Sequence, residues 1–159
     1  MKRILAALTA LLCLLIAGCS RAATPEPSAA PVSYEETNSE EIGMKLFIND
    51  SEVPVTWEKN DSVNALRALA HGDGLTVSMS MYGGFEQVGP IGQRLPRSDR
   101  QTTTQSGDIV LYSGDQIVVF YGSNTWAYTR LGHADLSPEE MTDLLANGDV
   151  TLRILEGEK

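Results

Sequence analysis

The chain has 159 residues and a formal net charge of −9, with 21 acidic residues against 12 basic ones. This balance opposes binding to nucleic acid or to anionic lipid headgroups through a generic basic patch. Both cysteines, Cys13 and Cys19, lie near the start of the chain, so the rest of the sequence offers no disulfide, no catalytic thiol and no thiolate metal ligand.

The first twenty residues, MKRILAALTALLCLLIAGCS, have the pattern of an export signal. Lys2 and Arg3 precede an apolar run over 5–17 that is too short to span a bilayer comfortably. The segment LIAGC at 15–19 resembles the lipobox of bacterial lipoproteins. The resemblance implies a signal peptide over 1–18, acylation of Cys19, and a cell-envelope protein held in the lipid bilayer on the extracytoplasmic face of a bacterial membrane. An ordinary secretory peptide or membrane anchor with a chance cysteine is the alternative.

Removal of this signal leaves 10 basic and 21 acidic residues, a net charge near −11. Residues 19–43 are rich in Ala, Pro, Ser, Thr and Glu and show no apolar periodicity. Such a segment cannot bury enough apolar surface to order itself, so we expect a disordered tether. The remaining residues, 44–157, are enough for one domain with a single core.

The first half of this domain predicts strands and one short helix. Residues 45–49 (KLFIN) and 53–58 (VPVTWE) alternate in polarity and predict a hairpin. Asn60 or Asp61 can cap a helix over 62–70. Residues 75–80 predict a strand. The following segment, MYGGFEQVGPIGQRLPRSD at 81–99, is rich in glycine and predicts a long irregular connection.

The second half begins with a possible polar edge strand over 99–105, followed by a hairpin of 109–112 and 116–122. Residues 125–132 predict a strand with Trp126, Tyr128 and Arg130 on one face. Ser137 and Glu140 form a capping box that begins a second helix, and 149–156 predict the last strand. These elements predict a mainly β fold, a closed eight-stranded antiparallel β-barrel with two short capping helices.

Several segments resemble the bacterial cyclophilin-like domain family, over nearly all of residues 44–156. The most specific pieces are Met81-Tyr82-Gly83-Gly84, Gly107-Asp108 with Tyr112, and Phe120-Tyr121-Gly122 with Tyr128-Thr129-Arg130-Leu131-Gly132. The resemblance implies a cyclophilin-like β-barrel, related in fold to peptidyl-prolyl isomerases. A fold does not transfer an activity, which must be argued from the site.

This sequence departs from the catalytic pattern of cyclophilins. The Phe-His-Arg segment that supplies their arginine is absent, and the Gly-Phe-Met-x-Gln-Gly-Gly-Asp segment is echoed only loosely by GFEQVG at 84–89. Glu86 replaces the methionine of the pocket, and Gln87 lies one place early. No catalytic residue is therefore carried over, and a catalytic set stays unknown.

Candidate ligand-binding residues remain in the 81–100 connection and at the 121–130 rim, where an arginine could stand over an apolar pocket. Each arginine could equally be a solvated charge or a partner of Asp99, Asp108 or Glu86, and the aromatic residues could simply pack the barrel. Arg100 also flanks the connection. The candidates are Tyr82, Phe85, Gln87, Arg94, Arg97, Tyr121, Trp126, Tyr128 and Arg130.

Other chemistries lack their motifs. No phosphate loop and no G-x-S-x-G segment occurs, and the two histidines, His71 and His133, do not make a zinc site, so we predict no cofactor and no metal. Two functions stay open. The first is a tethered module that binds a proline-containing peptide or a small ligand, and the second is an active prolyl isomerase that assists folding in the envelope. A structural envelope protein without a ligand is the third possibility.

Overall fold

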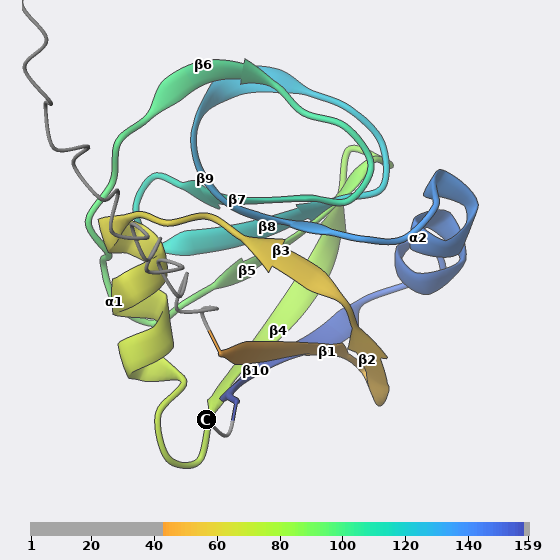
Figure 1. Ribbon diagram of the computed structural model, residues 1–159. Helices are drawn as coiled ribbons and strands as arrows, with labels where there is room; N and C mark the ends of the chain where they lie inside the picture. The colour runs from red at the N-terminus through yellow and green to blue at the C-terminus, as the bar shows by residue number, and fades with distance from the viewer. Residues whose placement is uncertain (1–42, 158–159) are drawn as a thin grey trace, which may run out of the picture. The chain divides into compact units, whose positions relative to one another are not determined.

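The computed structural model describes residues 43–157. The predicted signal peptide, the predicted acylation site Cys19 and the predicted tether, apart from Gly43, lie outside the described residues. Ten strands and two helices follow one another within these residues (Figure 1): β1 (Met44–Ile48), β2 (Ser51–Val53), β3 (Val55–Trp57), α1 (Asp61–Leu69), β4 (Leu75–Tyr82), β5 (Glu86–Pro90), β6 (Arg100–Thr103), β7 (Asp108–Tyr112), β8 (Gln116–Phe120), β9 (Thr125–Ala134), α2 (Pro138–Leu145) and β10 (Val150–Glu156).

The strands form one antiparallel sheet in the order β2-β1-β10-β4-β5-β8-β7-β9-β3. A single residue, Pro54, separates β2 from β3. The segment 51–57 therefore pairs with β1 through its first half and with β9 through its second half. This segment joins the two ends of the sheet, so that eight positions surround the barrel, and the predicted mainly β barrel with two helices is confirmed.

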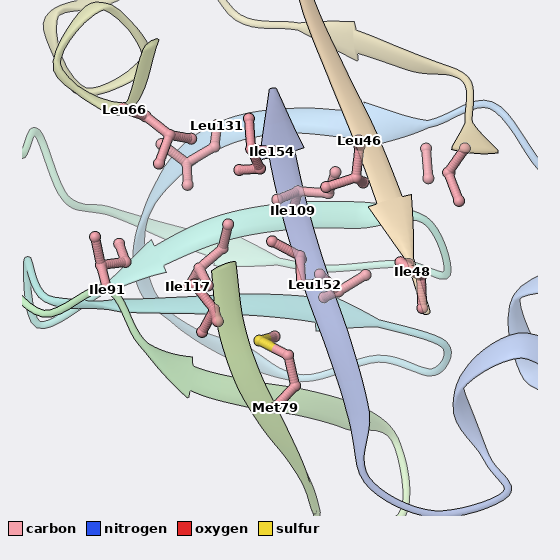
Figure 2. Packing of buried hydrophobic residues seen from close by; sticks show 14 of the residues in the cluster. Leu46, Ile48, Leu66, Met79, Ile91, Ile109, Ile117, Leu131, Leu152 and Ile154 are labelled. Atoms are coloured by element: carbon pink, nitrogen blue, oxygen red, sulfur yellow. The ribbon is translucent and has the colours of Figure 1, made fainter. Parts of the chain in front are cut away.

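The barrel interior is filled by aliphatic side chains, as expected for eight strands. Leu46, Ile109 and Leu152 come from three different strands, β1, β7 and β10, and are fully buried. Figure 2 shows side chains of the front strands meeting those of the strands behind them. The helices add Leu66 from α1 and Met141 from α2 to the same core.

Both helices begin where the sequence predicts a cap. The Asn60 side chain accepts a hydrogen bond from the Val63 N–H at 2.9 Å at the start of α1. At α2 the Glu140 N–H donates to Ser137 Oγ at 3.2 Å, and the Ser137 N–H donates to the Glu140 carboxylate at 2.8 Å. Each cap satisfies N–H groups that have no partner within the helix.

No helix described between residues 43 and 157 is long and apolar enough to cross a membrane.

The segment 81–99 is more regular than predicted. β4 continues to Tyr82, two glycines with positive φ make the turn, and β5 follows, paired with β4 and with β8. Gly89 and Pro90 conceal this strand in the sequence because both residues disfavour strands. Gly89 is required by packing, since a Cβ there would lie 2.5 Å from Val77 and 2.6 Å from the Met79 sulfur.

β9 is the longest strand and has three partners. β7 pairs along one edge, whereas β6 and β3 share the other edge, β6 beside Thr125–Tyr128 and β3 beside Gly132–Ala134. The register between β7 and β9 shifts between Ile109 and Val110. β6 confirms the polar edge strand predicted over 99–105. The domain begins and ends at one place, because the Gly157 N–H donates to the Gly43 carbonyl at 2.7 Å.

We expect the packed interior to dominate stability. Leu152→Ala removes a fully buried side chain from β10 and should lower the free energy of unfolding by about 2–5 kcal/mol. Thr151→Ala, on the exposed face of the same strand, should change it by no more than about 0.5 kcal/mol. Urea denaturation followed by circular dichroism measures both values. Equal losses for the two variants would contradict the filled interior.

Candidate functional site

A second apolar cluster lies on the outside of the barrel. Alternation along β7 and β8 sends one set of side chains inward, and sends Val110, Val118 and Phe120 outward, where they are buried together with Tyr128 of β9. Phe85, Val88 and Tyr112 pack against this cluster. β7 and β8 are therefore buried on both faces, which explains their nearly continuous apolar sequences.

Aromatic rings give this outer cluster a defined shape. The Phe85 and Phe120 rings are parallel, with centroids 6.5 Å apart. Tyr128 makes edge contacts with Phe120 at 5.7 Å and with Tyr112 at 6.1 Å. The Asn124 side-chain amide donates to the Tyr128 hydroxyl at 3.1 Å. These contacts fix Tyr128 in place and make a rigid aromatic floor.

A cavity of about 430 Å³ lies over this floor. Tyr82, at the end of β4, and Trp126, on β9, stand at its rim and are 66% and 57% exposed. They are the two most exposed large hydrophobic side chains among residues 43–157. We call this hollow the aromatic cavity, and its lining residues are Tyr82, Glu86, Val88, Tyr112, Gln116, Val118, Asn124, Trp126 and Tyr128.

Glu86 is the ionisable carboxyl group of the aromatic cavity. It occupies β5 two residues before Val88, so the two side chains share the outer face of that strand. Glu86 is only 6% exposed, and its Oε2 atom is buried without a hydrogen-bond partner among residues 43–157. Burial raises the pKa of Glu86 from its usual 4.5 to about 7. Burial, and next the charge of Glu86, raise the pKa of Tyr128.

A second hollow, of about 400 Å³, lies on the other side of Tyr128, beside the start of α1. Arg97, Arg100 and Arg130 line it, and we call it the polar cavity. Arg130 contacts the buried Asp108 at 2.6 Å and Glu58 at 3.6 Å, while Arg97 pairs with Asp99 at 3.4 Å. Two of its three arginines are thus held by carboxylates of the protein itself.

Asp108 is the centre of a small charged cluster next to the polar cavity. Its side chain is 1% exposed and accepts the Gln105 N–H at 3.0 Å. The Nδ1 atom of His133 lies 3.0 Å from the same Asp108 oxygen that Arg130 contacts. These contacts tie β7 to β9 close to their register shift. The sequence left open whether Arg130 is a solvated charge or pairs with an acidic residue such as Asp108. The structure shows the pair with Asp108.

The structure brings three of the sequence-predicted candidates together, since Tyr82, Trp126 and Tyr128 all line the aromatic cavity. Phe85 lies under it, in the stacked pair with Phe120. Arg97 and Arg130 line the polar cavity. Arg94 is elsewhere, paired with Asp115 at 3.1 Å.

The last two candidates have contacts inside the fold. The amide of Gln87 is buried and donates to the Leu145 carbonyl at 2.8 Å and to the Gly148 carbonyl at 2.7 Å, next to the end of α2. Tyr121 packs against the main core, and its hydroxyl is buried without a partner. Neither residue lines the aromatic cavity.

Glu86 is the site residue that sequence reasoning did not select. The signal was present, because a glutamate replaces a pocket methionine and is flanked by aromatic and aliphatic residues. It was missed because the segment was predicted to be irregular, which left no strand face on which to place the side chain. Within residues 43–157, no three histidine, aspartate or glutamate side chains come together in a way that could hold a metal ion.

The fold and the site together define the class of protein: a filled β-barrel with an aromatic cavity on its outer face. A model of the Cyclophilin-like family matches residues 46–155, and the chain belongs to this family. Comparison with curated proteins finds no match. Among solved structures, the chain is similar to McbB in complex with tryptophan, with a TM-score of 0.52 and 11% identity. That likeness covers 73% of this chain and 45% of McbB, and it shows the fold alone.

The raised pKa of Glu86 predicts a pH-dependent stability. Because the folded protein holds this proton more tightly than the unfolded chain, the contribution of Glu86 becomes less favourable as the pH rises from 4.5 to about 7. Glu86→Gln removes the titration, and the variant should gain on the order of 3 kcal/mol over wild type between about pH 4 and pH 8. Urea denaturation across this range measures the difference.

Glu52→Gln is the matched control, because Glu52 is exposed and pairs with Lys45 at the surface. We expect it to follow the wild-type pH profile closely. A Glu86→Gln profile parallel to that of wild type would show that the Glu86 carboxyl group titrates normally.

Proposed function

We propose that this protein is a membrane-tethered, non-catalytic binding module whose ligand occupies the aromatic cavity. The observation that carries the proposal is the pairing of Tyr82 and Trp126, two exposed side chains from distant parts of the sequence that meet around one cavity. Large exposed apolar groups above a rigid, concave floor are typical of ligand sites. The barrel interior, by contrast, is filled with its own side chains.

The ligand would be a peptide, including a proline-containing one, or a small molecule. Aromatic walls suit a planar ring or a proline ring, and a few polar groups at the edge, Gln116 and Asn124 among them, can orient it. McbB, which has a related fold, is described in complex with tryptophan, and an aromatic amino acid has the size and shape that such a cavity accepts. This is an analogy of fold and adds only modest support.

The tether completes the proposal. The segment at 15–19 supports acylation of Cys19, and the acidic, proline-rich residues 19–43 would link this anchor to the barrel. The protein would then work in the cell envelope, on the extracytoplasmic face of a bacterial membrane. The anchor and the tether lie outside the described residues, so this part rests on the sequence alone.

Prolyl isomerase activity is the second candidate, and one arginine favours it. Arg100 lies directly opposite Tyr128 in the pairing of β6 with β9, and its side chain makes no ion pair within residues 43–157. An arginine beside an apolar pocket is what prolyl isomerisation requires, because it stabilises the pyramidal nitrogen of the twisted amide. However, Arg100 lines the polar cavity, and the aromatic cavity is lined by no arginine of the described chain.

We expect binding to depend on the rim of the aromatic cavity. Trp126→Ala and Tyr82→Ala should each weaken the binding of proline-containing peptides at least tenfold, measured by isothermal titration calorimetry, because each removes a large aromatic contact. Arg94→Ala is the matched control, since Arg94 is exposed and lies away from this cavity. Unchanged binding by both aromatic variants would place the site elsewhere.

We expect no catalysis of prolyl isomerisation. In a protease-coupled peptide assay, the wild-type protein should give the uncatalysed rate, because no arginine lines the aromatic cavity. A rate clearly above background that falls to background in Arg100→Ala would support the isomerase alternative instead. Arg67→Ala, on α1, would control for the loss of a positive charge.

A further inference from the structure

The aromatic cavity contains a buried carboxyl group beside which the described lining places no cation. Glu86 is nine-tenths buried, lines this cavity, and leaves Oε2 without a hydrogen-bond partner. The lining includes no lysine, arginine or histidine of the described chain. Most buried carboxylates are paired with a cation or accept several hydrogen bonds, so this arrangement calls for an explanation.

A bound cation would supply what is missing. An ionised carboxylate in an apolar site carries a desolvation penalty of several kcal/mol unless an opposite charge lies close to it. In the free protein a proton fills this role, which accords with the raised pKa of Glu86. A ligand with an ammonium group can replace that proton and donate a charge-assisted hydrogen bond to the carboxylate.

The walls of the aromatic cavity suit a cation for an independent reason. Tyr112 and Tyr128 form part of its floor, and Tyr82 and Trp126 stand at its rim. The faces of such rings attract an ammonium group, and the attraction is strongest where water is excluded. The same rings accept an apolar or aromatic body attached to that group. The carboxylate and the aromatic rings thus both favour a ligand that joins an ammonium group to an apolar body.

We propose that the aromatic cavity binds a ligand bearing a primary ammonium group on an aromatic or aliphatic body, with Glu86 as the partner of the ammonium. This inference rests on the proposed binding function and names its ligand class. A carboxylate on the ligand is disfavoured, because the lining offers it no cation and Glu86 repels it. A simple amine should therefore bind more tightly than the amino acid that contains it.

We expect the affinity for an amine to depend on pH through the ionisation of Glu86. The other titratable groups that face it are Tyr82 from β4, Tyr112 from β7 and Tyr128 from β9, while β8 contributes the uncharged Gln116 and Val118. Burial raises the pKa of Tyr128 from its usual value of 10, away from neutral pH. Between about pH 5.5 and pH 8.5 the Glu86 carboxyl group changes charge, because its pKa is about 7, and amine ligands stay protonated.

The test compares ligands of one shape and different charge. The full-length protein, held in detergent, is titrated by calorimetry with phenethylamine, with the neutral 2-phenylethanol, and with phenylalanine. We expect phenethylamine to bind at least tenfold more tightly than either of the others at about pH 8. Its affinity should rise about 30-fold between about pH 5.5 and pH 8.5, because the carboxylate must be ionised to bind it.

Variants separate the inference from the proposed function. Glu86→Gln should lose at least tenfold in phenethylamine affinity and all of the pH dependence, whereas its 2-phenylethanol affinity should stay within about twofold. Glu86→Asp, which keeps the charge, should retain part of the preference for the amine. Equal binding of phenethylamine and 2-phenylethanol, with both lost in Trp126→Ala, would overturn the ammonium inference and leave the binding site standing. No binding of either ligand to wild type would overturn the ammonium inference, and the peptide titrations with Trp126→Ala and Tyr82→Ala would then decide separately whether the aromatic cavity is a binding site.

A further arm identifies the source of the ammonium group. A capped peptide with lysine next to proline is compared with the same peptide in which norleucine replaces lysine. Tighter binding of the lysine peptide, lost in Glu86→Gln, assigns the cavity to a peptide side chain. Equal binding of the two peptides, together with selective binding of phenethylamine, assigns it to a free amine.

Discussion

The number of strands around the barrel governs where this protein can hold a ligand. Eight positions enclose a space that side chains fill completely, and Leu46, Ile109 and Leu152 occupy it here. Any binding site must then lie on the outer surface. β7 and β8 meet this requirement by carrying apolar side chains on both faces, one set for the interior and one for the outer cluster beneath the aromatic cavity. β7 and β8 therefore contribute to both the core and the site.

Glu86 shows that a polar group in the outer apolar cluster lowers the stability of the fold. Its neighbours on the outer face of β5 and β8 are Val88, Val118 and Phe120, where an apolar side chain would pack without a desolvation penalty. A glutamate at such a position makes the folded state less favourable at neutral pH than a neutral residue would. Residues of this kind concentrate at functional sites, where the unfavourable group becomes favourable once its ligand is bound. The polar cavity offers a contrast, because Arg130 and Asp108 already neutralise one another.

Local chemistry made much of the fold predictable. Ser137 and Glu140 predict the start of α2, and Ser113-Gly114 between two apolar runs predicts the hairpin of β7 and β8. Both motifs are readable in the sequence because each satisfies backbone groups within a few residues. β5 was missed because Gly89 breaks the expected pattern, and the reason for that glycine, the approach of Val77 and Met79, comes from another strand. Tyr82 and Trp126 were among the predicted candidates because they lie in the 81–100 connection and at the 121–130 rim. The sequence signalled Glu86 as an unusual residue, but its burial was not predictable, because burial depends on strand pairings that the sequence does not state.

The bond between Gly157 and Gly43 has a consequence for how the barrel is presented. Both ends of the domain emerge from the wall formed by β1 and β10, and in the circular strand order that wall lies opposite β8 and β7. The same adjacency lets the barrel act as an interchangeable unit, since a host chain could enter and leave at one spot without disturbing either the filled interior or the aromatic cavity.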